Sequence, residues 1–288
     1  MSALDRELDL VLGLIRRCGD VALRIQAGGD ETLQTTAKTE DQSPVTQADL
    51  AVEEAIVEAL REHFPDDAIL AEESAAAANW RAHERVWMID PVDGTKDFAS
   101  GDNSWAIHIG LAIAGRPALG VVHEPGHDRT NWAIDDGRER LCRYQVGRDG
   151  PIHEVASAGP NPTPKLRLVT SKSHRSERLD ALMERLGIGA DETLRTPSTG
   201  VKISMVARGE VGFYAHPTIG TKLWDSCAPE AILNAAGGRV TDMRGQPLTY
   251  AGPGYKNDLG LLASGRGFDH DALVESLRPL VDAWFGPG

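Results

Sequence analysis

Apolar residues recur every three to four positions along the first 25 residues, and this spacing predicts an amphipathic helix packed on the core. The residues on this face are Leu4, Leu8, Val11, Ile15, Cys18 and Ala22. Gly28 and Gly29 are expected to end this helix. Residues 30–43 are polar and predict a loop or hairpin. Thr46 is a suitable N-cap for a second helix, whose apolar side would be Val52, Ile56, Leu60 and Phe64.

Short apolar runs then predict strands. Residues 68–71 form one run, which ends at Glu72 and Glu73. Residues 86–89 are apolar on both faces, as in a buried strand, and Pro91 is expected to stop this strand. Residues 105–113 and 119–122 have a hairpin pattern, and 131–134 read as a further strand. Antiparallel signals after two helices predict an α+β arrangement for this half of the chain.

The pattern changes after residues 156–164, which are rich in proline and small residues and suit a domain boundary. Strands are expected at 166–170, 211–215, 240–241 and 260–263, and helices at 177–186, 201–208 and 229–236. The chain is expected to end in a helix with Leu273, Leu277, Leu280 and Trp284 in register. This alternation predicts an α/β half. We therefore expect two domains, an N-terminal one at 1–155 and a C-terminal one at 165–288.

Composition narrows the class of protein. The chain has 288 residues, 41% of them hydrophobic and 25% charged, which is ordinary for a globular protein. A formal net charge of -13 argues against binding to nucleic-acid polymers or to membrane surfaces. Three widely spaced cysteines without a Cys-x-x-Cys motif suggest neither a disulfide framework nor a zinc site. With no export signal or apolar span in the sequence, we expect a soluble, cytoplasmic protein.

Acidic residues stand where predicted strands end or a helix begins. Glu72, Asp90 and Asp93 follow strands, and Asp225 lies just before Pro229, where it could also simply cap a helix. Carboxylates gathered this closely would repel one another unless divalent cations neutralised them, and all-oxygen ligands favour magnesium over zinc. Gly94 permits close backbone approach. Thr95 adds a hydroxyl and an amide, which suits a phosphate site.

Three segments carry a resemblance to a known family. Glu72-Glu73-Ser74, Asp90-Pro91-Val92-Asp93-Gly94-Thr95 and Trp224-Asp225 resemble, in order and spacing, the motifs of the lithium-sensitive, magnesium-dependent inositol monophosphatase superfamily. The resemblance runs from about Ser43 to Ala263. It implies the layered αβαβα sandwich shared by the inositol monophosphatases and fructose-1,6-bisphosphatases.

Further details look most like the 3'(2'),5'-bisphosphate nucleotidases of this superfamily. They are Lys96 after Asp-Gly-Thr, Ser43-Pro44-Val45-Thr46-Gln47-Ala48-Asp49, Ser198-Thr199-Gly200-Val201-Lys202-Ile203 and Lys222-Leu223-Trp224-Asp225-Ser226-Cys227-Ala228-Pro229-Glu230. One departure is Thr221-Lys222-Leu223, where eukaryotic members usually carry a basic pair directly before the tryptophan. This departure leaves the substrate less firmly indicated than the reaction.

The resemblance also implies roles for individual residues. Glu72, Asp90 and the Val92 carbonyl would hold a first magnesium ion and its nucleophilic water, and Thr95 and Asp49 would take the proton. From the residues alone, Asp49 could equally be an acid favoured by a helix dipole. Asp90, Asp93 and Asp225 would hold a second ion, and Glu72 would help with a weaker third. The amides of Gly94 and Thr95 would bind the phosphate.

The implied substrate contacts are less specific. Lys96, Lys202 and Lys222 are candidates for a second phosphate or for charge balance, although single lysines are usually solvated surface residues. Ser171, His174 and Gly200 lie in segments that resemble the family's nucleotide-binding region, and His174 also reads as a surface histidine.

The implied activity is removal of the 3'-phosphate from adenosine 3',5'-bisphosphate, or its sulfated form, to leave AMP, with inhibition by lithium. The alternatives are a phosphatase for inositol monophosphate, histidinol phosphate or fructose 1,6-bisphosphate, and, in another class, a non-catalytic nucleotide or metal binder. The sequence argues against the non-catalytic alternative, because a protein without catalysis would be free to lose a motif residue. This chain keeps the four motif acids as well as Asp49 and Thr95. The partner is then a small phosphorylated nucleotide, and the protein a monomer or homodimer.

Overall fold

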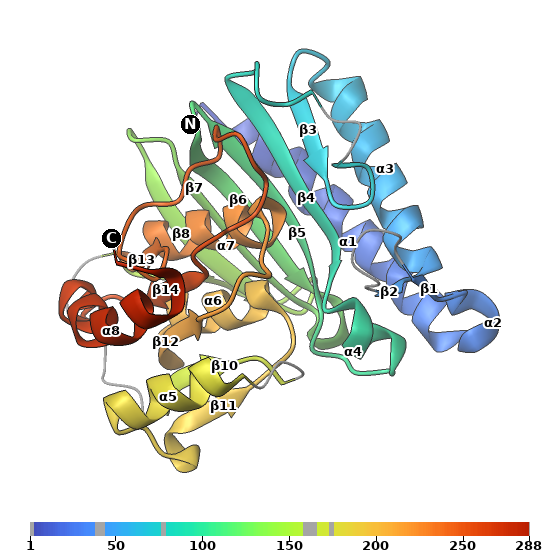
Figure 1. Cartoon of the computed structure of the whole chain (residues 1–288). Coiled ribbons are helices and arrows are strands. Elements are labelled where there is room, and N and C mark those ends of the chain that lie inside the picture. The colour runs from blue at the N-terminus through green and yellow to red at the C-terminus, as the bar shows by residue number, and fades with distance from the viewer. Residues whose placement is uncertain (1–2, 38–43, 76–78, 158–165, 173–175, 288) are drawn as a thin grey trace.

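The computed structural model describes residues 3–37, 44–75, 79–157, 166–172 and 176–287. Two β-sheets alternate with three layers of helices (Figure 1). Along the stack, the layers are α1 with α3, a seven-stranded sheet, α6 with α7, a five-stranded sheet, and α5 with α8. The predicted αβαβα sandwich is confirmed.

The first helical layer follows the sequence pattern closely. Helix α1 (Asp5–Ala27) buries five of the six predicted positions, and the sixth, Leu4, is buried as its N-cap. Helix α3 (Gln47–His63) begins after Thr46, whose hydroxyl accepts a hydrogen bond from the Ala48 amide at 3.2 Å. The segment 30–43, predicted as a loop or hairpin, contains a short helix, α2 (Asp30–Leu33), and a strand, β1 (Thr36–Ala37), which pairs antiparallel with β2 (Pro44–Val45) just after the segment. Residues 38–43 of that segment lie outside the described residues.

The seven-stranded sheet has the order β3-β4-β5-β6-β7-β8-β9, and only the β3–β4 pair is parallel. Its strands are β3 (Ala68–Ala71), β4 (Arg85–Asp93), β5 (Ala106–Ile113), β6 (Arg116–Glu124), β7 (Arg129–Asp135), β8 (Arg140–Val146) and β9 (Ile152–Glu154). The last two strands were not predicted. The prediction that Pro91 stops its strand is wrong, because β4 continues to Asp93 through an irregularity in register between Asp90 and Asp93. A bulge can accommodate a proline, which has no N–H for the strand ladder.

The five-stranded sheet has the order β11-β10-β12-β14-β13 and mixes parallel and antiparallel pairs. Its strands are β10 (Leu166–Thr170), β11 (Thr193–Arg195), β12 (Val211–His216), β13 (Arg239–Thr241) and β14 (Leu261–Ser264). Its outer face is covered by α5 (Glu177–Leu186) and α8 (His270–Phe285). The described residues also include the short helix α4 (Thr95–Ala99) and the 3-10 turns Pro125–His127 and Ala190–Glu192.

The central helices, α6 (Thr199–Ala207) and α7 (Leu223–Ala235), lie between the two sheets. The prediction that the second of these begins at Pro229 is wrong, because α7 begins six residues earlier and holds Pro229 in its interior. Burial on both sides stabilises this helix despite the hydrogen bond that a proline removes.

Two glycines bring α7 close to the seven-stranded sheet. Gly110 and Gly120 face each other on β5 and β6. A Cβ atom on Gly120 would lie 2.2 Å from the Ala228 carbonyl oxygen, and one on Gly110 would lie 2.8 Å from the Ala228 nitrogen. The helix can therefore approach the sheet only because both positions lack a side chain.

The three cysteines, Cys18, Cys142 and Cys227, are buried and unpaired. Burial raises the pKa of Cys18 to about 11 and that of Cys142 to about 12, and it raises the pKa of Cys227 well above the ordinary value. Among the described helices, none is both long and apolar enough to cross a membrane.

Candidate active site

A cavity of about 320 Å³ opens where β4, the first turn of α4 and the starts of α6 and α7 meet. Eight of the residues singled out from the sequence line it: Glu72, Asp93, Gly94, Thr95, Lys96, Ser171, Lys202 and Asp225. The acids come from separate segments, because Glu72 follows β3, Asp93 ends β4 and Asp225 lies in the first turn of α7. The fold thus brings these carboxylates together across 153 positions of the sequence, from 72 to 225.

Asp90 and Asp225 are neighbours in the acidic cluster, with Asp90 buried and Asp225 half-buried at the cavity. Burial, followed by the charges of Glu72, Asp93 and Asp225, raises the pKa of Asp90 well above its ordinary value. Burial, followed by Asp93 and Glu72, raises the pKa of Asp225 to about 7. Asp225 also caps its own helix, since its Oδ2 accepts a hydrogen bond from the Lys222 amide at 2.7 Å. Asp225 therefore both caps helix α7 and belongs to the acidic cluster.

Asp93 connects this cluster to α6. Its Oδ2 accepts hydrogen bonds from the Ser198 hydroxyl at 2.6 Å and from the Gly200 amide at 2.9 Å. His108 Nε2 lies 3.1 Å from the same oxygen. Burial by itself would raise the pKa of Asp93, but His108, Lys202 and Ser198 lower it below its ordinary value. Asp93 is therefore an anion held between two parts of the fold.

Thr95 and Asp49 are adjacent, as expected from the sequence. The Thr95 hydroxyl lies 3.1 Å from Asp49 Oδ1 and 2.9 Å from the Val92 carbonyl oxygen, so it can donate its single proton to either. Burial raises the pKa of Asp49 to about 6, against hydrogen bonds from Thr46 that lower it. Gly94 precedes Thr95 with φ of 100°, a conformation that favours glycine.

The three lysines occupy different environments. Lys96 is exposed at the cavity. Lys202 is only 2% exposed, and its Nζ donates hydrogen bonds to the carbonyl oxygens of Thr196, at 3.3 Å, and Pro197. Burial lowers the pKa of Lys202 to about 8, although nearby Asp93 and Asp225 oppose this shift. Lys222 Nζ lies 3.9 Å from Glu72 Oε1. The interpretation as a solvated surface lysine is therefore wrong for Lys202.

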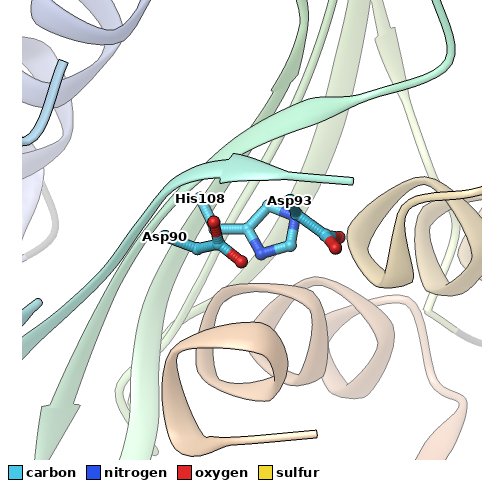
Figure 2. Close-up of side chains that lie close together, drawn as sticks. All are labelled: Asp90, Asp93 and His108. Atoms are coloured by element: carbon cyan, nitrogen blue, oxygen red, sulfur yellow. The ribbon is translucent and has the colours of Figure 1, made fainter. Parts of the chain in front are cut away.

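His108 is a site residue that the sequence analysis did not identify. It lies on β5 directly opposite Asp90, and Figure 2 shows its ring beside the carboxyl groups of Asp90 and Asp93. Donor atoms of these three residues all lie within 4.8 Å of one another. The available signal was a histidine within the otherwise apolar stretch 105–113. His174, by contrast, falls outside the described residues, so its role stays a prediction.

Comparisons with known proteins agree with this geometry. The sequence model of the inositol monophosphatase family matches residues 6–280. The chain is 33% identical over 245 residues to the 3'(2'),5'-bisphosphate nucleotidase CysQ of Salmonella typhimurium, covering 84% of this chain and 93% of that protein. It is 27% identical to the 3'(2'),5'-bisphosphate nucleotidase 1 of Rattus norvegicus, over 92% and 93% of the two chains. Among solved structures, the IMPase of Thermotoga maritima superposes with a TM-score of 0.75 at 25% identity, over 96% and 99% of the two chains.

Proposed function

The chain belongs to the inositol monophosphatase family, and from this premise we propose that it is a magnesium-dependent phosphatase that removes the 3'-phosphate of adenosine 3',5'-bisphosphate to leave AMP. One observation carries the proposal: Glu72, Asp93, Asp225 and Thr95 line one cavity, with Asp90 buried beside the three acids and Asp49 buried beside Thr95. The choice of nucleotide is supported by the relatives, since two bisphosphate nucleotidases match over most of the chain.

The acidic cluster fits divalent ions. Burial, and after it the charges of the neighbouring carboxylates, raise the pKa values of Asp90 and Asp225, so cations that neutralise these carboxylates would relieve an electrostatic cost already present in the fold. Glu72, Asp90 and the Val92 carbonyl would hold one Mg²⁺, and Asp90, Asp93 and Asp225 a second, with Glu72 contributing to a third. When bound, Mg²⁺ supplies Lewis-acid charge for the phosphate and an activated water.

Within this proposal Thr95 and Asp49 handle the proton. Thr95 is a poor base by itself, but its hydroxyl can pass a proton to Asp49, 3.1 Å away. A pKa of about 6 leaves Asp49 largely ionised, yet able to accept a proton, near neutral pH. The carboxylate is fixed in place, because its other oxygen accepts hydrogen bonds from the amide and hydroxyl of Thr46 at 2.7 and 2.6 Å.

The substrate contacts divide by exposure. Lys96 is the candidate for the second phosphate, because it is the exposed lysine at the cavity. Lys202 donates hydrogen bonds to main-chain carbonyls and balances the negative charge of Asp93. Lys222 balances the negative charge of Glu72. Gly94, Thr95, Ser171 and His174 remain proposed contacts to the phosphate and nucleotide. Inhibition by Li⁺, a monomeric or homodimeric state and a cytoplasmic location belong to the same proposal.

The test is phosphate release from a substrate panel, with and without Mg²⁺. The panel contains adenosine 3',5'-bisphosphate and its sulfated form, inositol monophosphate, histidinol phosphate and fructose 1,6-bisphosphate. We expect kcat/KM to be highest for adenosine 3',5'-bisphosphate and activity to disappear without the ion. A strong preference for inositol monophosphate would refute the nucleotidase assignment. Tight binding of substrates without release of phosphate from any of them would favour the non-catalytic binder.

The metal role is tested by Asp90→Asn, which removes one charge from the buried centre of the cluster while keeping its shape. We expect kcat to fall at least about 100-fold, because several kcal/mol of charge stabilisation depends on the ions. Asp9→Asn is the matched control, since Asp9 is an exposed acid on α1, and it should leave kcat unchanged. An unchanged rate in Asp90→Asn would contradict the role of this cluster.

A further inference from the structure

His108 is a fully buried imidazole at the edge of the acidic cluster. Its side chain is 0% exposed, and neither ring nitrogen has a hydrogen bond of acceptable geometry within the described part of the chain. Nε2 lies 3.1 Å from Asp93 Oδ2, an ion-pair distance, without meeting the geometric criteria for a hydrogen bond. Leaving buried polar atoms without partners costs about 1–3 kcal/mol each, so a residue that serves packing alone would more simply be apolar.

The oxygen beside His108 is already occupied. Asp93 Oδ2 accepts hydrogen bonds from Ser198 and Gly200, and a carboxylate oxygen accommodates about two donors. Both donors belong to the start of α6, where Ser198 is the N-cap and Gly200 the second residue. The position of this first helical turn therefore determines how the Asp93 carboxylate is held, and Oδ1 is the oxygen left for a cation.

His108 in turn determines where that helical turn can lie. A Cβ atom built on Gly200 would be 2.0 Å from His108 Nε2 and 2.7 Å from its Cε1. The backbone of Gly200 therefore packs directly on the imidazole edge. Figure 2 shows the ring on β5, close to Asp93 at the end of β4. A larger residue at 200 or a smaller one at 108 would change the height of the turn above the sheet.

We propose that His108 is a positioning residue for the metal site. It supports the first turn of α6, so that Ser198 and Gly200 hold Oδ2 of Asp93 and orient this carboxylate for the cation. His108 acts through Asp93 and is not itself a ligand. The inference rests on the proposed metal role of Asp93 and extends it to a residue on the neighbouring strand.

The test measures ion binding directly, with Mn²⁺ as the probe and its free-ion EPR signal as the readout. We expect His108→Ala to weaken Mn²⁺ binding about 10- to 100-fold, the usual effect of losing a residue that orients a metal ligand. His108→Gln, whose amide nitrogen can occupy the place of Nε2, should recover most of the affinity. Unchanged affinity in a folded His108→Ala protein would overturn the proposal. Nitrogen coupling in the spectrum of bound Mn²⁺ would also overturn it, because the histidine would then be a ligand.

Gly200 supplies an independent variant in case His108→Ala does not fold. Gly200→Ala should weaken Mn²⁺ binding, because the new methyl group collides with the imidazole. The same change should be far less harmful in the His108→Gln background, where a flexible side chain can yield, so the two effects should not add. Strict additivity would overturn the proposed contact.

His123→Ala is the matched control. His123 is also buried and also packs against a glycine, since a Cβ atom on Gly19 would lie 2.7 Å from its Nε2. It lies on β6, packs against Gly19 of α1 and contacts Arg129 and Thr130. Its loss should lower Tm without changing Mn²⁺ affinity, and an equal loss of affinity would refute a specific role for His108. A wild-type protein that binds neither Mn²⁺ nor Mg²⁺ would refute the proposed function itself.

Discussion

Asp49 divides its two carboxylate oxygens between two tasks. Oδ2 closes the capping box of α3 by accepting hydrogen bonds from Thr46, and Oδ1 faces the Thr95 hydroxyl. The sequence left two interpretations of Asp49, an acid stabilised at the start of a helix and a proton acceptor, and the structure is compatible with both. A cap that is also the acceptor is rigid, and rigidity keeps a catalytic carboxylate in the orientation its hydrogen bond requires.

Thr95 gives the sharpest residue-level prediction. Thr95→Ala should lower kcat by about 100- to 10,000-fold, because the hydroxyl that passes the proton to Asp49 is lost. Thr95→Ser keeps that hydroxyl and should stay within about tenfold of the wild-type kcat. Steady-state phosphate release with saturating Mg²⁺ measures both. If the serine variant lost as much activity as the alanine variant, the methyl group rather than the hydroxyl would be what matters.

The candidate site was predictable wherever local chemistry marks a residue. The acids near predicted element ends, together with the Gly94–Thr95 turn, carry such marks; Glu72, Asp93, Asp225, Gly94 and Thr95 line one cavity, and Asp90 is buried beside these acids. His108 carries only a weak mark, a histidine in an apolar stretch, since its position depends on the strand register that sets it opposite Asp90 and on the helix packed against it. The environment of Lys202 likewise follows from tertiary burial, which a sequence motif does not report.

At the scale of elements, the contact between α7 and the sheet controls where Asp225 stands. Asp225 is in the first turn of α7, and the helix rests on Gly110 and Gly120 through Ala228. The spacing between helix and sheet is therefore part of the metal site, although neither glycine touches an acid of the cluster.

Gly120→Ala tests this control. The added methyl would lie 2.2 Å from the Ala228 carbonyl, so α7 must move away from the sheet. We expect a loss of about 1–3 kcal/mol in the free energy of unfolding, as for other overpacked cores, together with weaker Mg²⁺ activation. Gly13→Ala on the exposed side of α1 is the control and should stabilise the protein by up to about 1 kcal/mol. Urea unfolding measures the stability, and the Mg²⁺ dependence of kcat measures the effect on the site. A destabilised Gly120→Ala protein with normal Mg²⁺ activation would show that the distance between α7 and the sheet does not affect the site.

Helices in which apolar residues recur at helical spacing over many residues were predictable, as α1, α3, α5 and α8 show. Strands β8, β9 and β11 were missed, and two element boundaries were wrong at prolines. Pro91 and Pro229 are local signals for ending a strand and starting a helix, but a bulge in β4 and two-sided burial of α7 override both signals. The local conformational preference of a residue therefore sets the end of a helix or strand only where tertiary packing does not override it.

At the scale of the whole molecule, α7 belongs to the packing of both sheets. Its residues share hydrophobic clusters with β4 and β5 on one side and with β12 and β14 on the other. We propose that residues 1–155 and 165–288 are two parts of one cooperative unit, with the site between them. The sequence indicated which residues feed each sheet, but strand order and the placement of α6 and α7 between the sheets depend on long-range contacts.

Cooperative unfolding is therefore the expected behaviour. Differential scanning calorimetry should show one transition, with the calorimetric enthalpy equal to the van't Hoff enthalpy, because neither part can bury α7 alone. A control scan of Gly120→Ala should show one transition at a lower Tm. Two resolved transitions would mean that the parts fold as separate domains.

The three buried thiols make this chain its own reporter of unfolding. Burial raises the pKa of Cys18 to about 11 and that of Cys142 to about 12, so each of these two has a thiolate fraction of at most about one in ten thousand at neutral pH. Burial also raises the pKa of Cys227 well above its ordinary value, and the core shields all three thiols. Alkylating reagents and oxidants thus find almost no nucleophile in the native protein. These reagents can reach all three thiols once the layers separate. The rate of thiol modification therefore reports how often the whole protein unfolds.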